Sequence, residues 1–116
     1  MRSDIAPFLP LSPATLHILL ALAGQNRHGY GIMQEVARQS DGSYKLGPGT
    51  LYDNLQKLLD QGMIDEAPAV STADPRRRCY RLTRFGRAVL SADIARLEVV
   101  VRDAKRSLQA ARPGGA

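Results

Sequence analysis

Six arginines form the most distinctive cluster of charge in this sequence. They fall within twelve consecutive positions that contain no aspartate or glutamate, and they are Arg76, Arg77, Arg78, Arg81, Arg84 and Arg87. Guanidinium groups bind phosphate oxygens through charge and through paired N–H donors. An isolated arginine run is often only a solvated loop, so the cluster indicates a polyanion partner only if the fold presents it suitably. The net charge of +5 and the pI near 9.9 favour the same kind of partner.

The residue types that most often carry catalysis are few and scattered. His17 falls within an apolar helical segment and His28 in a polar turn, and both fit a structural role better than a catalytic one. Cys79 is the only cysteine, so it forms no disulfide within the chain and fits a reducing cytoplasm. An ordinary strand cysteine is its simpler interpretation, and a redox-sensing thiol is the alternative. No phosphate loop, nucleophile elbow or zinc-ligand spacing occurs, so we expect no enzyme, no metal and no other cofactor.

Three short amphipathic helices are predicted over residues 12–23, 29–40 and 48–61, after a proline-rich segment, residues 1–11, that we expect to be an extended arm. Serine at position 12 is a typical helix cap, proline suits the first helical position, and glycine suits the position just after a helix. Apolar residues recur at helical spacing in all three segments. The inward faces that this spacing predicts are Leu16, Leu19, Leu20 and Ala23; Ile32, Met33, Val36 and Ala37; and Leu51, Leu55, Leu58 and Leu59.

The sequence pattern changes after the third helix. Residues 63–67 and 79–83 have the length and alternation of strands, and a polar, proline-containing loop separates them. We predict an antiparallel hairpin that lies against the helices, because an isolated hairpin is not stable. Residues 84–111 form one long helical pattern, and residues 112–116 cannot continue it and should fray.

The long C-terminal pattern also carries a heptad repeat of apolar residues. Its members are spaced alternately four and three residues apart, and they are Leu90, Ile94, Leu97, Val101, Ala104 and Leu108. In a monomer of this size such a strip would stay exposed to water. We therefore expect a homodimer, with packing on Leu16 and Leu20 of the same chain as the alternative. A two-fold axis would place the two copies of the third predicted helix about 34 Å apart, a distance that equals one turn of double-stranded DNA.

The order helix, helix, turn, helix, hairpin, helix is typical of a winged helix-turn-helix. The predicted fold class is mainly α with a small β-hairpin, followed by a long C-terminal dimerisation helix. Residues 1–11 would form the arm, 12–83 the DNA-binding domain, 84–111 the dimerisation helix and 112–116 a disordered tail. In this architecture the third helix enters the major groove and the hairpin reaches a phosphate backbone or the minor groove. That placement puts Arg76, Arg77 and Arg78 at the wing, where each phosphate contact would add salt-dependent affinity.

The third helix supplies the candidates for sequence recognition. Its outward residues include Thr50, Asp53, Asn54 and Lys57. Asn54 could bond adenine through two hydrogen bonds, and Lys57 could bond guanine or a phosphate. Asp53 could accept a hydrogen bond from cytosine or form an i, i+4 pair with Lys57, and we slightly favour the pair.

Positive neighbours must complement this helix, because its acidic and basic residues nearly cancel. Lys45, just before the helix, and the arginine-rich wing would supply that charge. Free amides at the helix start bind phosphate, and Gly49 permits a close approach there. Arg81 alternates with apolar strand neighbours, so it faces away from the core and could reach either DNA or water.

Several motifs together resemble the PadR family of transcriptional regulators, in its shorter form with a single C-terminal helix. They are Leu11-Ser12-Pro13, Leu19-Leu20-Ala21-Leu22, His28-Gly29-Tyr30-Gly31-Ile32, Gly47-Pro48-Gly49-Thr50-Leu51-Tyr52, Gly62-Met63-Ile64, and Arg77-Arg78-Cys79-Tyr80-Arg81-Leu82-Thr83 with Gly86. The resemblance covers about residues 11 to 105. It implies a homodimer whose C-terminal helices pack on the partner's first helix, which would place Leu16 and Leu20 in the dimer interface.

The resemblance also implies how such a dimer works. Relatives usually repress by occupying a palindromic operator in double-stranded DNA, and often release it when a small molecule binds near the dimer interface. By the same resemblance, Thr50 and Tyr52 lie at the groove-facing start of the third helix, and Tyr30 lies near a phosphate. Asp53 stands where many relatives have proline. The chain has no tryptophan, so we do not expect a flat aromatic drug to be sandwiched as in some multidrug-sensing relatives.

A winged helix can instead serve as a protein-interaction module, because a fold does not fix a function. Steep salt dependence of duplex binding would favour DNA over a protein partner. No segment has the ~18 apolar residues that a membrane span needs.

Overall fold

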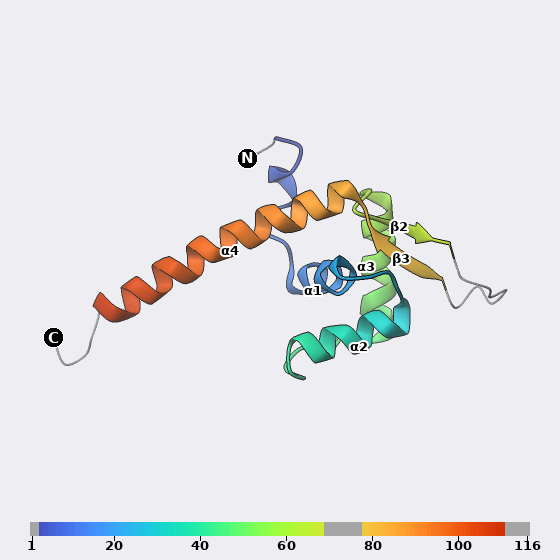
Figure 1. Cartoon of the computed structure of the whole chain (residues 1–116), viewed down its shortest axis with the longest axis horizontal. Helices are drawn as coiled ribbons and strands as arrows, with labels where there is room; N and C mark the ends of the chain where they lie inside the picture. Colours follow the sequence, from blue (N-terminus) through green and yellow to red (C-terminus); the bar gives the residue numbers. More distant parts are fainter. Residues whose placement is uncertain (1–2, 69–77, 111–116) are drawn as a thin grey trace.

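A computed structural model of the chain describes residues 3–68 and 78–110. In chain order its elements are η1 (Ala6–Phe8), α1 (Pro13–Ala23), β1 (Arg27–His28), α2 (Gly29–Gln39), α3 (Pro48–Asp60), β2 (Ile64–Ala67), β3 (Cys79–Leu82) and α4 (Arg84–Ala110). Figure 1 shows α1, α2 and α3 gathered into one body with the small sheet beside them, and α4 running far beyond that body. The predicted fold class, mainly helical with a small β-structure and a long last helix, is confirmed. Arg76, Arg77 and the tail 112–116 lie outside the described residues.

Helix α1 lies at the centre of the core, with other elements packed around it. It contacts α2, α3, α4 and β3, so most of its circumference is covered. Its buried residues are Ile18, Leu19, Ala21 and Leu22. The predicted inward face was therefore wrong in part, because Leu16, Leu20 and Ala23 are only partly buried. The helix is apolar on most sides, and periodicity does not single out one inward face in such a helix.

Helices α2 and α3 follow the prediction more closely, although Met33, Ala37 and Leu59 of the predicted inward faces are only partly buried. Ile32 and Val36 are the buried aliphatic residues of α2, and Leu51, Leu55 and Leu58 are buried in α3. Local capping fixes the ends of α1 and α3 as expected. The Ser12 hydroxyl accepts a hydrogen bond from the Thr15 amide at 3.2 Å at the start of α1. Gly62 adopts a φ of +76° just after α3, which a side chain would disfavour.

The β-structure is a three-stranded antiparallel sheet with the order β1-β3-β2. Strand β2 pairs with β3 as the predicted hairpin, and Ile64 lies opposite Leu82. The prediction missed β1, whose two residues, Arg27 and His28, pair with Tyr80 and Cys79. Such a short strand has no period of its own, so only its non-local pairing with β3 identifies it.

Helix α4 starts on the core and leaves it. The Thr83 hydroxyl accepts a hydrogen bond from the Gly86 amide at 2.9 Å and donates one to the Gly62 carbonyl at 2.6 Å. Val89 and Leu90 are buried in the core, whereas every residue from Glu98 to Ala110 is exposed. Leu90 is only 4% exposed, so its expected place in an interface with another chain is corrected to the core of its own chain.

The segment before α1 is not the extended arm that we expected. It contains the short helix η1, and Ile5 is buried in the core. The rings of Phe8 and Phe85 pack edge to face with centroids 5.7 Å apart, so the segment lies against the first turns of α4. Apolar side chains spaced without a regular period still bury themselves wherever a neighbouring surface is available. Within the described part of the chain, no helix combines the length and apolar character that crossing a membrane requires.

Candidate nucleic-acid interface

The start of α3 presents uncapped backbone amides to solvent. Gly47 is the N-cap residue and provides no side-chain hydrogen bond, and the next three residues, through Thr50, are all exposed. The amides of Gly49 and Thr50 therefore face no capping side chain at the positive end of the helix dipole. Such a helix start favours an anion such as a phosphate group.

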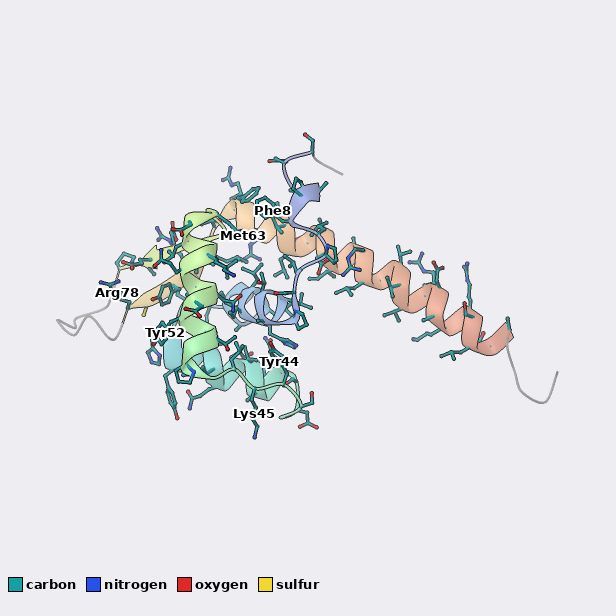
Figure 2. All side chains as sticks on the ribbon, turned by 180° about the vertical axis from the view of Figure 1, so that it is seen from behind. Phe8, Tyr44, Lys45, Tyr52, Met63 and Arg78 are labelled. Atoms are coloured by element: carbon teal, nitrogen blue, oxygen red, sulfur yellow. The ribbon has the colours of Figure 1, made fainter. Side chains whose placement is uncertain are left out.

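The connector before α3 is held in place by stacking. The rings of His17 on α1 and Tyr44 in the connector stack with centroids 4.6 Å apart. Ser40 at the end of α2 bonds both the amide and the carbonyl of Tyr44, at 3.0 Å each. Lys45 follows and is exposed, and Figure 2 shows it at the end of the molecule where α3 begins. The lysine thus lies close in sequence and space to the exposed start of α3.

The outward face of α3 carries Asp53 and Lys57, both exposed. The i, i+4 ion pair that we favoured for these residues is absent from the part of the chain that the structure describes. Both side chains are therefore available to a ligand on this face.

Asn54 is placed differently from the prediction. It is half-buried, and its amide donates a hydrogen bond to the Thr50 carbonyl at 2.8 Å. Its side-chain oxygen accepts one from the Thr15 hydroxyl on α1 at 3.4 Å. The expected outward side chain that reads adenine is thus corrected to one that joins α3 to α1. Outward spacing on a helical wheel does not reveal that α1 crosses α3 at this point.

Tyr52 projects from α3 toward α2 and the sheet. A Cβ atom at Gly29 would lie 2.5 Å from the Tyr52 hydroxyl oxygen, so the phenol occupies the space left by this glycine. Burial, the Glu66 carboxylate and the Tyr52 phenol all raise the pKa of Tyr80. The Tyr52 phenol and the Glu66 carboxylate are thus near enough to the Tyr80 hydroxyl to affect its pKa. Tyr52 is 47% exposed and Tyr30, the residue after Gly29, is 62% exposed, so both also reach solvent.

The described part of the wing carries two arginines that are paired with acids. Arg81 donates to Asp65, which lies directly opposite on β2, with Nε 2.6 Å from Oδ1, and this hydrogen bond raises the pKa of Arg81. Arg78 Nη1 lies 3.4 Å from Glu66 Oε1. The alternatives for Arg81 were DNA or water, and the structure adds a third, an internal carboxylate. Sequence reasoning missed both acids, because the cross-strand register that pairs them was unknown.

Other arginines stabilise the fold instead. Arg27 Nε donates to the Ala21 carbonyl at 2.7 Å, and Arg87 Nη2 donates to the Ala23 carbonyl at 3.3 Å. These bonds satisfy carbonyls that the end of α1 leaves open. Arg87, which we counted in the basic cluster, therefore contributes to the core frame.

An acid–base pair on α2 joins the largely covered Glu35 side chain to the exposed Arg38. Glu35 accepts hydrogen bonds from Arg38 at 2.7 and 2.6 Å, and these lower the pKa of its carboxyl from 4.5 to about 2. No group of His, Cys, Asp and Glu side chains in residues 3–68 and 78–110 could hold a metal ion.

The exposed half of α4 carries the remaining residues of the heptad. Ile94, Val101 and Leu108 are 37%, 50% and 76% exposed, and Ala104 is also exposed. A groove of about 460 Å³ runs along this face, and its lining residues are Ile94, Leu97, Glu98, Val101, Arg102 and Lys105. Leu16 and Leu20 of α1 remain partly exposed. An apolar helix face of this kind, rimmed by charge, suits packing against another helix.

Solved structures with the same fold are regulators of transcription. A transcriptional regulator from Clostridium thermocellum superposes with a TM-score of 0.68 at 22% identity, over 93% of this chain and 98% of that one. A PadR family transcription regulator from Clostridium difficile gives a TM-score of 0.70 at 19% identity, over 84% and 99% of the two chains. Bacillus subtilis PadR in complex with operator DNA gives 0.62 at 23% identity, over 72% of this chain and 47% of that one.

Sequence comparison gives the family itself. "Transcriptional regulator Rv3488" of Mycobacterium tuberculosis is 39% identical over 89 residues, which are 76% of this chain and 78% of that protein. The model of the transcriptional regulator PadR-like family matches residues 18–92. Together these matches show that the chain belongs to the PadR-like family of transcriptional regulators, which are not enzymes.

Proposed function

We propose that this protein is a sequence-specific DNA-binding repressor that acts in the cytoplasm as a homodimer on a palindromic operator. The observation that carries the proposal is the exposed, uncapped start of α3, which has Lys45 before it and Tyr30, Tyr52 and the wing beside it. Bacillus subtilis PadR, which shares this fold, has been solved with operator DNA. Surfaces of the same kind in the same architecture support the same use.

The contacts divide between affinity and selectivity. The amides of Gly49 and Thr50 would bind a backbone phosphate, and Lys45 would add charge to that contact. Asp53 and Lys57 are exposed and free of each other, so they are the candidates for reading base edges in the major groove. Arg78, with Arg76 and Arg77 before it in the sequence, would supply most of the salt-dependent affinity.

A second copy of the chain is the proposed occupant of the exposed face of α4. The helix has 27 residues and is therefore about 40 Å long, at 1.5 Å per residue, and its second half leaves the body. Leu97 and Val101 line the groove there, and Leu16 and Leu20 extend the apolar surface on α1. A two-fold pairing of α4 would bury these residues and place two copies of α3 on successive turns of DNA, which calls for a palindrome.

Release of the operator by a small molecule completes the proposal. The groove of about 460 Å³ has the size of a ligand site and is lined by apolar side chains with a charged rim. An apolar molecule that enters it would alter the packing of the two copies and so the spacing of their reading helices. We therefore propose that the effector binds at the margin of this groove, beside the part that the second copy covers.

Selection of bound fragments from random duplex DNA tests the function. We expect the recovered sequence to be a palindrome with half-sites about one helical turn apart, and binding to it to weaken steeply with salt.

Alanine at Arg76, Arg77 and Arg78 should weaken all duplex binding. As a control, Arg106→Ala removes an exposed cation of α4 that does not line the groove, and this variant should bind almost as the wild type does. Unchanged binding in the wing variant would refute the role of the wing. Absence of salt-dependent duplex binding would favour a protein-interaction module instead.

A further inference from the structure

The two ion pairs of the wing lie on opposite faces of the sheet. In the β2–β3 register Asp65 is opposite Arg81, and Glu66 is opposite Tyr80. Neighbouring residues of a strand point to opposite faces. Asp65 and Arg81 therefore share one face, and Glu66 shares the other with Tyr80.

The face that carries Glu66 is the one turned toward α3. Ile64 and Tyr80 on that face are only 1% and 6% exposed, so it packs on the helices. The Tyr52 phenol of α3 and the Glu66 carboxylate both raise the pKa of Tyr80. Figure 2 shows Tyr52 and Arg78 on the same flank of α3, with Arg78 at the outer end of the strands. The pair of Arg78 and Glu66 thus borders the surface where the DNA backbone would pass between α3 and the wing.

The ion pair between Arg78 and Glu66 is weak. The Arg78 and Glu66 side chains are 60% and 49% exposed, and one contact of 3.4 Å joins them. Pairs of this kind contribute little to stability. The pair on the other face is shorter, at 2.6 Å, and Arg81 makes two hydrogen bonds to Asp65. Arg78 is therefore the wing cation in residues 78–82 that a phosphate could take over more easily.

We propose that Glu66 competes with the DNA backbone for Arg78 and so limits the affinity of the wing for any duplex. In the free protein the Glu66 carboxylate pairs with the Arg78 guanidinium, at the position that a phosphate oxygen would take. When DNA is bound, Arg78 turns from the carboxylate to the phosphate, so binding must first break this ion pair. A repressor with this built-in competitor binds phosphate less tightly and leaves its site more readily. The inference rests on the proposed function, since it needs a duplex bound at this surface.

The test compares two isosteric substitutions on the two faces of the sheet, Glu66→Gln and Asp65→Asn. Binding of each variant to a fluorescent duplex of scrambled sequence is measured by anisotropy over a range of salt concentrations. We expect Glu66→Gln to bind about three- to tenfold more tightly, with a salt slope steeper by about 0.9, the effect of one further effective positive charge. Asp65→Asn should stay within about twofold of the wild type. Thermal unfolding of both variants confirms that they are folded.

The same measurement in an Arg78→Gln background separates the mechanism from simple repulsion. If Glu66 acts by holding Arg78, most of the gain from Glu66→Gln should vanish in that background. A gain that persists in full would overturn the proposal, and so would Glu66→Gln binding no more tightly than the wild type. If the wild type itself shows no salt-dependent binding to any duplex, the proposed function fails. If the wild type binds and Glu66→Gln changes nothing, only the present inference fails.

Discussion

The same substitution, glycine to alanine, should have different consequences for stability at two buried glycines, Gly29 and Gly86. At Gly29 the new methyl group would lie 2.5 Å from the Tyr52 hydroxyl oxygen and 3.0 Å from Cζ. Those atoms form the far end of a side chain that is 47% exposed, so the phenol can swing into solvent. At Gly86 the methyl group would overlap the backbone carbonyl of Met63, which cannot move without shifting the start of β2.

The magnitudes follow from these contacts. Alanine is favoured over glycine in a helix interior by about 1 kcal/mol. Gly29 is the first residue of α2, so only part of this gain applies there, and it partly offsets the contact that Tyr52 loses. We expect the unfolding free energy of Gly29→Ala to lie within about 1 kcal/mol of the wild type. At Gly86 overpacking against backbone costs about 1–3 kcal/mol or more, and the Thr83 cap is disturbed as well, so a loss of about 2 kcal/mol is expected.

Chemical denaturation and duplex binding together test the pair. Gly29→Ala should keep its stability but bind duplex DNA about fivefold more weakly, because displaced Tyr52 no longer lies between α3 and the sheet; this corresponds to about 1 kcal/mol. Gly86→Ala should show a clear loss of stability. Equal destabilisation by both variants would refute the claim that Tyr52 fills the space at Gly29. Wild-type binding by a stable Gly29→Ala variant would refute its role at the DNA surface.

Three further substitutions test other parts of the structure. Leu97→Asp should give a monomer or aggregate in light scattering, whereas Val99→Asp, on another side of α4, should stay dimeric; an intact Leu97→Asp dimer would show that the groove is not the interface. Asn54→Ala should lower the unfolding free energy by about 1 kcal/mol because the side chain holds two hydrogen bonds within the chain. Unchanged stability would mean that Asn54 is free to contact a base. The folded-state pKa of Glu35 is depressed, so its contribution to stability is present above pH 4.5 and disappears as the pH falls toward about 2. Glu35→Gln should flatten acid unfolding in that window, and an unchanged acid curve would contradict the pairing.

Features that depend on local sequence could be predicted well. The start of α1 at Ser12, the end of α3 before Gly62 and the inward leucines of α3 all follow from capping and helical spacing. The long C-terminal helix was expected over 84–111 and is described as Arg84–Ala110. These features need only a residue and its neighbours along the chain, so the sequence contains all the information that they require.

Features that depend on distant parts of the chain could not be predicted. Strand β1 exists because β3 pairs with it, and Asn54 is half-buried because Thr15 on α1 lies beside it. The partners of Asp65 and Glu66 could not be predicted, because they depend on the register of β2 against β3. The two strands are joined by residues 69–77, which lie outside the described residues, and the sequence pattern of the strands does not determine that register. Polar residues at a candidate site were therefore identified by type but not by partner.

The heptad of α4 shows why one regular pattern had two meanings. Leu90 is 4% exposed in its own core, and Val101, eleven positions later on the same apolar strip, is 50% exposed. Between them Asp93 is fully buried and pairs with the half-exposed Arg96 at 2.7 Å. The apolar repeat is continuous along α4 because the first part of the helix packs in the core of its own chain and the second part is the proposed contact with a partner chain. A shift of the exposed half would therefore be carried through Val89 and Leu90 into the body that holds α3, since a helix transmits displacement along its length. In the proposed dimer, this connection would let the packing of the two copies set the distance between their α3 helices.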